Sequence, residues 1–173
     1  HIPGENMIWA DTQGNIGWQA VGIAPVRNNF SGLVPVPGDG TYEWDRYLPI
    51  LQKPNALNPT KGFIATANQN VTPKDYPHWN AIGYSWSDPY RGERVNEVLE
   101  NNDALTMEDM KALQVDVTSI PARTLIPYLK GLHFDAFETV QKERLLNWDT
   151  RLNSSSIEAA IYVSWENEIK NAA

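Results

Sequence analysis

Residues 7–21 read MIWADTQGNIGWQAV, and this stretch decides how the first half of the chain folds. Two short apolar runs, residues 7–10 and 16–21, flank the turn-forming sequence DTQGN. Gly14 can adopt the positive φ that a tight turn needs, so we predict a β-hairpin here. The sequence around this hairpin is rich in Gly, Pro and Asn. Together, the hairpin and this composition predict that the first half of the chain consists of short strands and loops.

Residues 1–87 are therefore predicted to form a strand and loop segment, and residues 88–173 a helical segment of about five helices. Residues 33–38 read LVPVPG, and their two prolines lack the backbone N–H that a central strand donates. We expect an extended surface loop there. Residues 62–68 read GFIATAN and are predicted as a short, well-buried strand.

Helix start signals open the second segment. Asp88 can act as an N-cap with Pro89 at the first helical position. Thr106 is predicted to cap the next helix, with Asp109 placed favourably in its first turn. These residue types occur where a helix has unsatisfied backbone N–H groups, so we predict helices beginning at both places.

Three further helices are predicted over residues 121–132, residues 136–148 and from Ser155 onward. In the last helix, apolar residues recur at every fourth position and predict one buried face. These residues are Ile157, Ile161, Trp165 and Ile169.

Composition excludes several classes of function. The chain has 173 residues, with 14 Lys and Arg against 21 Asp and Glu, and this net charge of −7 argues against a nucleic-acid partner. It has no cysteine, which removes disulfides and thiolate chemistry, and no apolar run long enough to span a membrane. The three histidines, His1, His78 and His133, are dispersed without metal-ligand spacing. No metal or cofactor site is predicted.

Arg94 is the first anomaly in the helical segment. If residues 89–101 are helical, Arg94 lies between Tyr90 and Val98 on an apolar stripe. A guanidinium is always charged and must be paired when it faces a core. Two interpretations remain open, a structural salt bridge or an arginine that orients polar groups or a substrate in a cleft.

Asn68 is the second anomaly, because its amide stands where an apolar run gives way to a polar loop. Such an amide commonly caps a turn. The alternative is a hydrogen-bond donor directed at developing negative charge, as an oxyanion hole requires. The pattern of residues leaves both interpretations open.

The motif ADTQGNIGW at residues 10–18, followed by Gly22, Pro25 and Arg27, is similar to the large-subunit signature A-D-x-x-G-N-I-G-Y…G-x-x-P-x-R of the penicillin acylase (penicillin amidase) family. Further pieces agree in the same order along nearly the whole chain, and a series is more specific than any one motif. They are Val36-Pro37-Gly38, Glu43-Trp44, Asn58-Pro59, residues 62–68, Asp75-Tyr76-Pro77, residues 90–95, Leu105-Thr106, Gln114, Asp116, Ser119 and Trp148-Asp149.

The resemblance implies an α+β fragment of an N-terminal nucleophile hydrolase with αββα architecture. Family members use the first Ser of the large subunit to attack an amide carbonyl, with its own α-amine as general base, and pass through an acyl-enzyme. The residue matching Asn68 would donate to the oxyanion. The residue matching Arg94 would hydrogen-bond around that Asn and help to position a small-molecule amide substrate, such as an acylated β-lactam or an N-acyl homoserine lactone.

The departures from the family pattern carry their own expectations. The chain begins at His1 and holds no N-terminal Ser, so the nucleophile is absent from it and the chain by itself is predicted to be inactive. We expect it to be a processed or cut piece whose partners are the rest of the acylase large subunit and the small subunit. Isolated, it would expose apolar surface and self-associate.

The sequence also bears on a metal site, on the location of the protein and on two alternative functions. Many members bind calcium through acids of both subunits, but no carboxylate stands near Gly83 where a ligand would be expected, so we carry over no metal. The resemblance alone implies a secreted or periplasmic location. One alternative is a non-catalytic binding module, since seven Trp and seven Tyr could form an aromatic platform. The other is a degenerate member that keeps only the scaffold.

Overall fold

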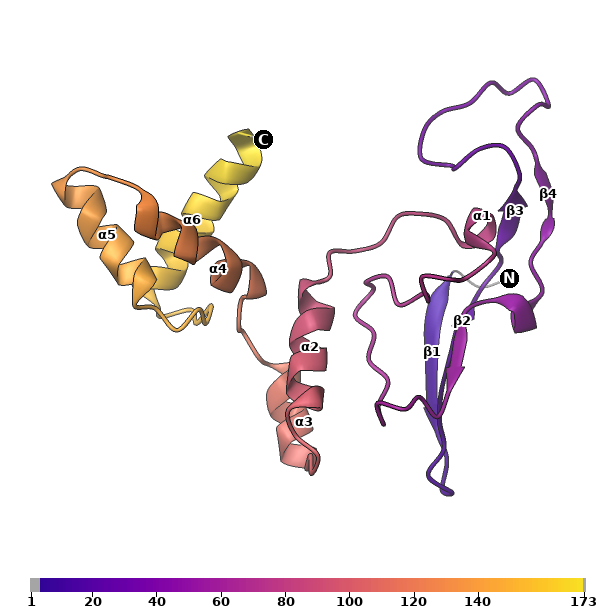
Figure 1. Ribbon diagram of the computed structural model, residues 1–173, viewed down its shortest axis with the longest axis horizontal. Coiled ribbons are helices and arrows are strands. Elements are labelled where there is room, and N and C mark those ends of the chain that lie inside the picture. Colours follow the sequence, from indigo (N-terminus) through magenta and orange to yellow (C-terminus); the bar gives the residue numbers. More distant parts are fainter. Residues whose placement is uncertain (1–3, 173) are drawn as a thin grey trace. The chain divides into compact units, whose positions relative to one another are not determined.

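The computed structural model describes residues 4–172, and the chain divides after Gly92 into two compact units. Strands, loops and short helical segments make up the first unit, and helices make up the second (Figure 1). This is the mixed α+β class that the sequence predicts. The division falls inside α2 (Tyr90–Glu100). The assignment of residues 1–87 to the sheet of an αββα fold stays a prediction.

The first unit contains two small antiparallel sheets. In one, β1 (Glu5–Ala10), β2 (Ile16–Val21) and β5 (Asn55–Leu57) lie in the order β1-β2-β5. In the other, β3 (Pro25–Arg27) pairs with β4 (Trp44–Tyr47). The β1–β2 pair is the hairpin that the opening motif predicts.

The hairpin turn is held by its own side chains. Asp11 Oδ1 accepts hydrogen bonds from the backbone N–H of Gln13 at 2.9 Å and of Asn15 at 2.8 Å. Gly14 has φ +86°, the left-handed region that its missing Cβ makes accessible. These bonds lower the pKa of the Asp11 carboxyl, the hydrogen bond from the Asn15 side chain most of all.

One local prediction for this unit holds and one is wrong. Residues 33–38 form no strand, as their prolines require. Residues 62–68 do not form one either: they join neither sheet, and their middle residues are only half-buried. The apolar content of this run predicted a strand, but a strand also needs a neighbour to pair with, and here the run ends where Asn68 turns the chain.

A small core lies beneath the second sheet of the first unit. It consists of Ala24, Val26, Leu48 and Ala81, with Tyr76 packed against them. Ala81 comes from the short helix α1 (Trp79–Ile82), which follows the η1 turn (Ile50–Gln52) and β5 along the chain. Trp18 of β2 is 6% exposed, and its indole Nε1 donates to Asn6 Oδ1 at 2.7 Å. That bond satisfies the indole's single polar group.

The second unit is helical. After α2 come α3 (Met107–Gln114), α4 (Ile120–Leu125), the 3-10 helix η2 (Ile126–Gly131), α5 (Ala136–Leu146) and α6 (Ile157–Ala172). Counting α2, residues 88–172 hold five α-helices, the number predicted for this half. No helix in the described part of the chain is long and apolar enough to cross a membrane.

The helix starts follow the capping signals. The backbone N–H of Tyr90 donates to Asp88 Oδ1 at 3.1 Å, and α2 begins there. At α3, Thr106 Oγ1 accepts from the N–H of Asp109 at 3.2 Å while Asp109 Oδ2 accepts from the N–H of Thr106 at 2.8 Å. This reciprocal pair is a capping box, so both predicted starts are confirmed within a residue or two.

The single helix predicted over residues 121–132 is wrong. It is broken into α4 and η2 because Pro127 lies in its middle, and a proline there has no N–H to donate to the preceding turn. Both pieces contribute to one core, with Ala122 from α4 and Ile126 and Leu129 from η2.

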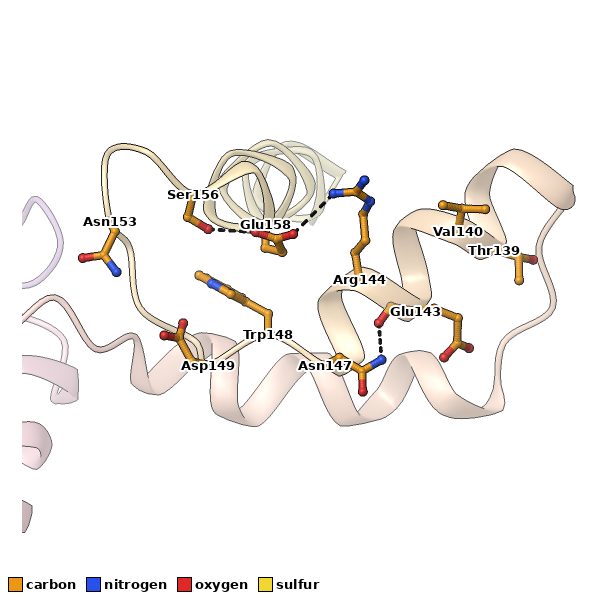
Figure 2. A pocket seen from close by; sticks show the side chains of 10 residues that line it. All are labelled: Thr139, Val140, Glu143, Arg144, Asn147, Trp148, Asp149, Asn153, Ser156 and Glu158. Carbon is orange, nitrogen blue, oxygen red and sulfur yellow. Dashed lines mark hydrogen bonds and ion pairs between the residues drawn. The ribbon is translucent and has the colours of Figure 1, made fainter.

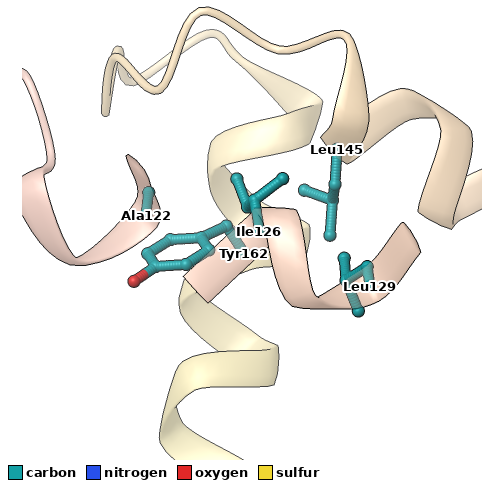
Figure 3. Packing of buried hydrophobic residues seen from close by; sticks show 5 residues of the cluster. All are labelled: Ala122, Ile126, Leu129, Leu145 and Tyr162. Carbon is teal, nitrogen blue, oxygen red and sulfur yellow. The ribbon is translucent and has the colours of Figure 1, made fainter. Parts of the chain in front are cut away.

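This core gathers around Tyr162 of α6, which is 1% exposed (Figure 3). Leu145 of α5 contributes from another helix, and the Tyr162 ring centroid lies 5.6 Å from that of Trp148 and 6.2 Å from that of Trp165. Ile161 also packs against the cluster. Burial of this face is the main tertiary constraint on α6.

The buried face of α6 is only partly the predicted one. Ile161 and Trp165 pack on the core, but Ile157 is 60% exposed and Ile169 39% exposed. At 3.6 residues per turn, each step of four residues drifts about 40° around the helix. Over the three steps from 157 to 169 the stripe therefore turns about 120°, and its two ends leave the contact face.

Candidate functional site

A hollow of about 860 Å³ opens on the first unit, and Asn68 lies in its lining. Apolar side chains such as Trp18 and Val21 line it together with the polar side chains of Asn6 and Thr66. Apolar walls with a few polar groups are typical of sites for small organic molecules. The hollow lies wholly within residues of the first unit.

Asn68 has an unusual backbone for a residue other than glycine, with φ +69°. Asn tolerates this left-handed conformation better than most residues. Its carbonyl accepts from the N–H of Ser87 at 3.2 Å, and its side-chain Oδ1 accepts from Arg91 Nη2 at 3.1 Å. Within residues 4–172, the Nδ2 group of Asn68 donates to no other residue, so its N–H groups remain available to a ligand.

The sequence did not single out Arg91, which the structure places beside Asn68. The same Nη2 donates to the carbonyl of Ala67 at 2.8 Å. Arg91 is exposed at the start of α2 and therefore leaves no trace in the apolar pattern of that helix. Its sequence signals are its place in the matching segment 90–95, which assigned it no role, and its position three residues before Arg94 on the same side of a helix.

Arg94 belongs to the second unit and is paired, as an arginine within an apolar stripe must be. Its Nε and Nη2 each lie 3.1 Å from one oxygen of Asp116, and its Nη1 lies 3.0 Å from Glu97 Oε2. The fork geometry supports the salt-bridge interpretation. Asn68 belongs to the first unit, so the expected hydrogen bonding of Arg94 around Asn68 stays a prediction.

Asp116 holds Arg94 in place and is itself held by Thr118 and Arg151. Its side chain is 13% exposed, and its Oδ1 also accepts from the N–H of Thr118 at 2.9 Å. Arg151 Nη1 approaches its Oδ2 at 3.5 Å. The hydrogen bonds from Arg94 keep the pKa of the Asp116 carboxyl well below its usual range, against the desolvation that raises it.

Glu97 extends this network of charges. Arg123 Nη1 donates to both of its carboxylate oxygens at 2.8 Å, and Arg94 approaches it from the other side. The hydrogen bond from Arg123 is the largest cause of the lowered pKa of Glu97. Conversely, the bond to Asp116 raises the pKa of the Arg94 guanidinium. Arg94 therefore stays cationic near neutral pH.

Asp116→Asn is expected to lower the free energy of unfolding of the 173-residue chain by about 1–3 kcal/mol near pH 7, between the values for exposed and buried ion pairs. The Asp116 pKa is lower in the folded than in the unfolded chain, so its contribution is present above the unfolded value of about 4. It is lost as the pH falls through the folded pKa. Urea unfolding followed by circular dichroism at about pH 7 and pH 3 measures this difference.

The asparagine can keep the hydrogen bond from Thr118 through its oxygen, but it loses the charge and the acceptor that Oδ2 offers to Arg94 Nη2. The part of the difference from wild type that is due to charge should shrink in acid. Asp103→Asn changes an exposed carboxylate of the same unit and serves as control, with an expected change within about 0.5 kcal/mol. Equal stability of Asp116→Asn and wild type at neutral pH would show that the pair contributes nothing.

A second hollow of about 860 Å³ lies on the helical unit, around Trp148 (Figure 2). On its rim Arg144 Nη1 lies 3.4 Å from Glu158 Oε1, and Ser156 Oγ donates to Glu158 Oε2 at 3.2 Å. Neither Asn68 nor Arg94 lines this hollow. It is therefore separate from the candidate site.

The first hollow also carries a buried cation. Lys53 is 4% exposed and lines it, and its Nζ donates to the carbonyl of Gly22. Burial lowers the pKa of this ammonium. Within residues 4–172, no group of three or more His, Cys, Asp and Glu side chains is arranged to hold a metal ion. His1 lies outside the described residues.

Comparison with known proteins places the chain in a family. A family model described as penicillin amidase matches residues 1–173. Acyl-homoserine lactone acylase QuiP of Pseudomonas syringae pv. tomato is 34% identical over 173 residues, which cover 91% of this chain and 20% of that protein. Penicillin G acylase of Escherichia coli is 35% identical over 149 residues, covering 84% of this chain and 18% of that protein.

A solved structure shows the same fold. The thermostable penicillin G acylase from Alcaligenes faecalis matches with a TM-score of 0.68 at 23% identity, over 87% of this chain and 28% of that chain. The chain thus spans about a fifth of the length of the curated relatives it matches. With the family model matching over its whole length, the chain belongs to the penicillin amidase family.

Proposed function

We propose that this chain is the part of a longer amidohydrolase that supplies the oxyanion donor Asn68. The observation that carries the proposal is the state of its amide. The Oδ1 atom is held by Arg91, and the backbone has φ +69°. The residue lines an open hollow, and its Nδ2 group has no partner among residues 4–172. A preset neutral donor of this kind stabilises negative charge without giving up a proton.

The reaction follows from the family. The N-terminal Ser of the large subunit, which is not part of this chain, attacks the amide carbonyl through its Oγ and passes its proton to its own α-amine. The carbonyl oxygen becomes an oxyanion that Asn68 Nδ2 hydrogen-bonds, the C–N bond breaks, and the amine leaves with that proton. Water then hydrolyses the acyl ester, releasing a carboxylic acid and restoring the Ser.

The substrate class is a linear N-acyl amide. Two relatives of nearly equal identity are named for acyl-homoserine lactones and for penicillin G, so both kinds of acyl amide are candidates. Arg94, fixed by Asp116, would keep a positive charge near the reacting groups. The rest of the large subunit and the small subunit are the partners, the expected location is secreted or periplasmic, and the isolated chain would be inactive and self-associate.

The test is hydrolysis by the longer protein of a panel of N-acyl homoserine lactones, acyl anilides and penicillin G. We expect equal amounts of acid and amine, and a transient acyl adduct on the N-terminal Ser by mass spectrometry. Replacement of that Ser by Ala should abolish both. A mature protein that cleaves no member of the panel and forms no adduct would favour the scaffold or binding-module alternative.

A further inference from the structure

We infer that Arg91 is a positioning residue that sets which way the Asn68 amide faces. This inference rests on the proposed function, because orientation of the amide matters only if Asn68 donates to the reacting oxygen. The role concerns Arg91 itself and is distinct from the role expected of Arg94.

The orientation follows from the chemistry of the two side chains. A carboxamide presents an acceptor oxygen on one side and a donor NH₂ on the other, and electron density rarely distinguishes them. A guanidinium has only donors. Since Arg91 Nη2 lies 3.1 Å from the side chain of Asn68, the atom facing it must be Oδ1, and Nδ2 must face away.

Arg91 is itself anchored. Its Nη2 also donates to the carbonyl of Ala67 at 2.8 Å, one residue before Asn68. One nitrogen thus binds the backbone and the side chain of neighbouring residues. This arrangement restrains the torsion angles of Asn68 more tightly than either hydrogen bond alone.

Gly92, the next residue of α2, supports the same loop from another side. Gln69 Oε1 accepts from the backbone N–H of Ala67 at 2.6 Å, and the Gln69 amide lies so close to Gly92 that a Cβ there would overlap with it. The start of α2 therefore offers residues 67–69 two contacts, a guanidinium for Asn68 and a glycine surface for Gln69. Together they hold a residue whose backbone is in a sparsely populated conformation.

The test uses the longer, active protein and a double-mutant cycle. Arg91→Met should lower kcat by about 10- to 100-fold, the cost of a misplaced catalytic group, with KM changed by less than about threefold. Arg91→Lys keeps one donor and should recover part of the loss. In an Asn68→Ala background, Arg91→Met should have no further effect, because residues that act through one another are not additive.

Arg46→Met is the matched control, since it removes an exposed arginine of the same unit that does not line the hollow. Its kcat should equal that of wild type. Wild-type kcat in Arg91→Met, or losses that multiply in the double mutant, would overturn the role of Arg91 and leave that of Asn68 intact. Failure of the proposed function is a different result, namely an Asn68→Ala protein as active as wild type.

A second measurement does not depend on activity. In a crystal structure of Arg91→Met, the Asn68 side chain should be rotated or distributed over more than one conformer, while Ala67 and Gln69 keep their hydrogen bond. In Arg91→Lys it should stay close to its original place. An Asn68 side chain unmoved in Arg91→Met would refute the inference whatever the enzyme assay shows.

Discussion

Replacement of Asn68 by alanine in the longer, active protein is expected to lower kcat by about 10²–10³-fold, the effect of removing one oxyanion donor. The KM should change little, because the donor strengthens its bond only as the carbonyl oxygen becomes charged. Asn68 lines an open hollow, and its amide is held through Oδ1. Steady-state hydrolysis of an acyl anilide measures both constants.

The backbone conformation of Asn68 provides a control that separates loss of the amide from backbone strain. At φ +69° an alanine is strained by about 1–2 kcal/mol, whereas a glycine is not. Asn68→Gly and Asn68→Ala both remove the amide, so both should lose the same activity, and only the alanine variant should also lose stability. If Asn68→Gly kept wild-type kcat, the loss in alanine would reflect strain and the oxyanion role would be wrong.

Asn70→Ala is the matched change nearby. The Asn70 side chain accepts from the N–H of Thr72 at 2.9 Å, a local turn bond, and it does not line the hollow. Its kcat should equal that of wild type. Two asparagines of one loop would then differ in function because only Asn68 lines the hollow.

The parts of the fold that the sequence predicted are those whose signals act over a few residues. The hairpin depends on Asp11 and Gly14 within its own turn, and the start of α3 depends on Thr106 and Asp109 bonding to each other. The two wrong elements depended on something else. Residues 62–68 lacked a strand to pair with, and Pro127 outweighed the helical pattern around it.

The candidate site divides in the same way. Asn68 and Arg94 could be singled out because each is a polar residue that interrupts an apolar pattern. Their partners could not: Arg91 is 23 residues from Asn68 and Asp116 is 22 from Arg94, and no local rule links such positions. An exposed arginine and a loop carboxylate look like ordinary surface residues until the fold brings them to their partners. The family resemblance covered residues 90–95 and Asp116, but it gave a role only to Asn68 and Arg94.

Tyr162→Ala is expected to have the largest effect on stability, a loss of about 3–5 kcal/mol, the cost of truncating a large buried aromatic side chain. Tyr162 is 1% exposed and stands at the centre of a cluster with few other buried members (Figure 3). Since small domains are stable by only about 5–15 kcal/mol, the helical unit should lose a large part of its free energy of unfolding. Urea unfolding of the chain followed at 222 nm, where helices dominate the signal, measures this loss.

Tyr128→Ala is the control for this change, because it removes the same side chain from a residue that is 73% exposed in η2 of the same unit. Its free energy of unfolding should stay within about 0.5 kcal/mol of wild type. Equal effects of the two substitutions would mean that the packing around Tyr162 is not the core of this unit. A large difference would mean that α4, η2, α5 and α6 are stabilised together by packing around one residue.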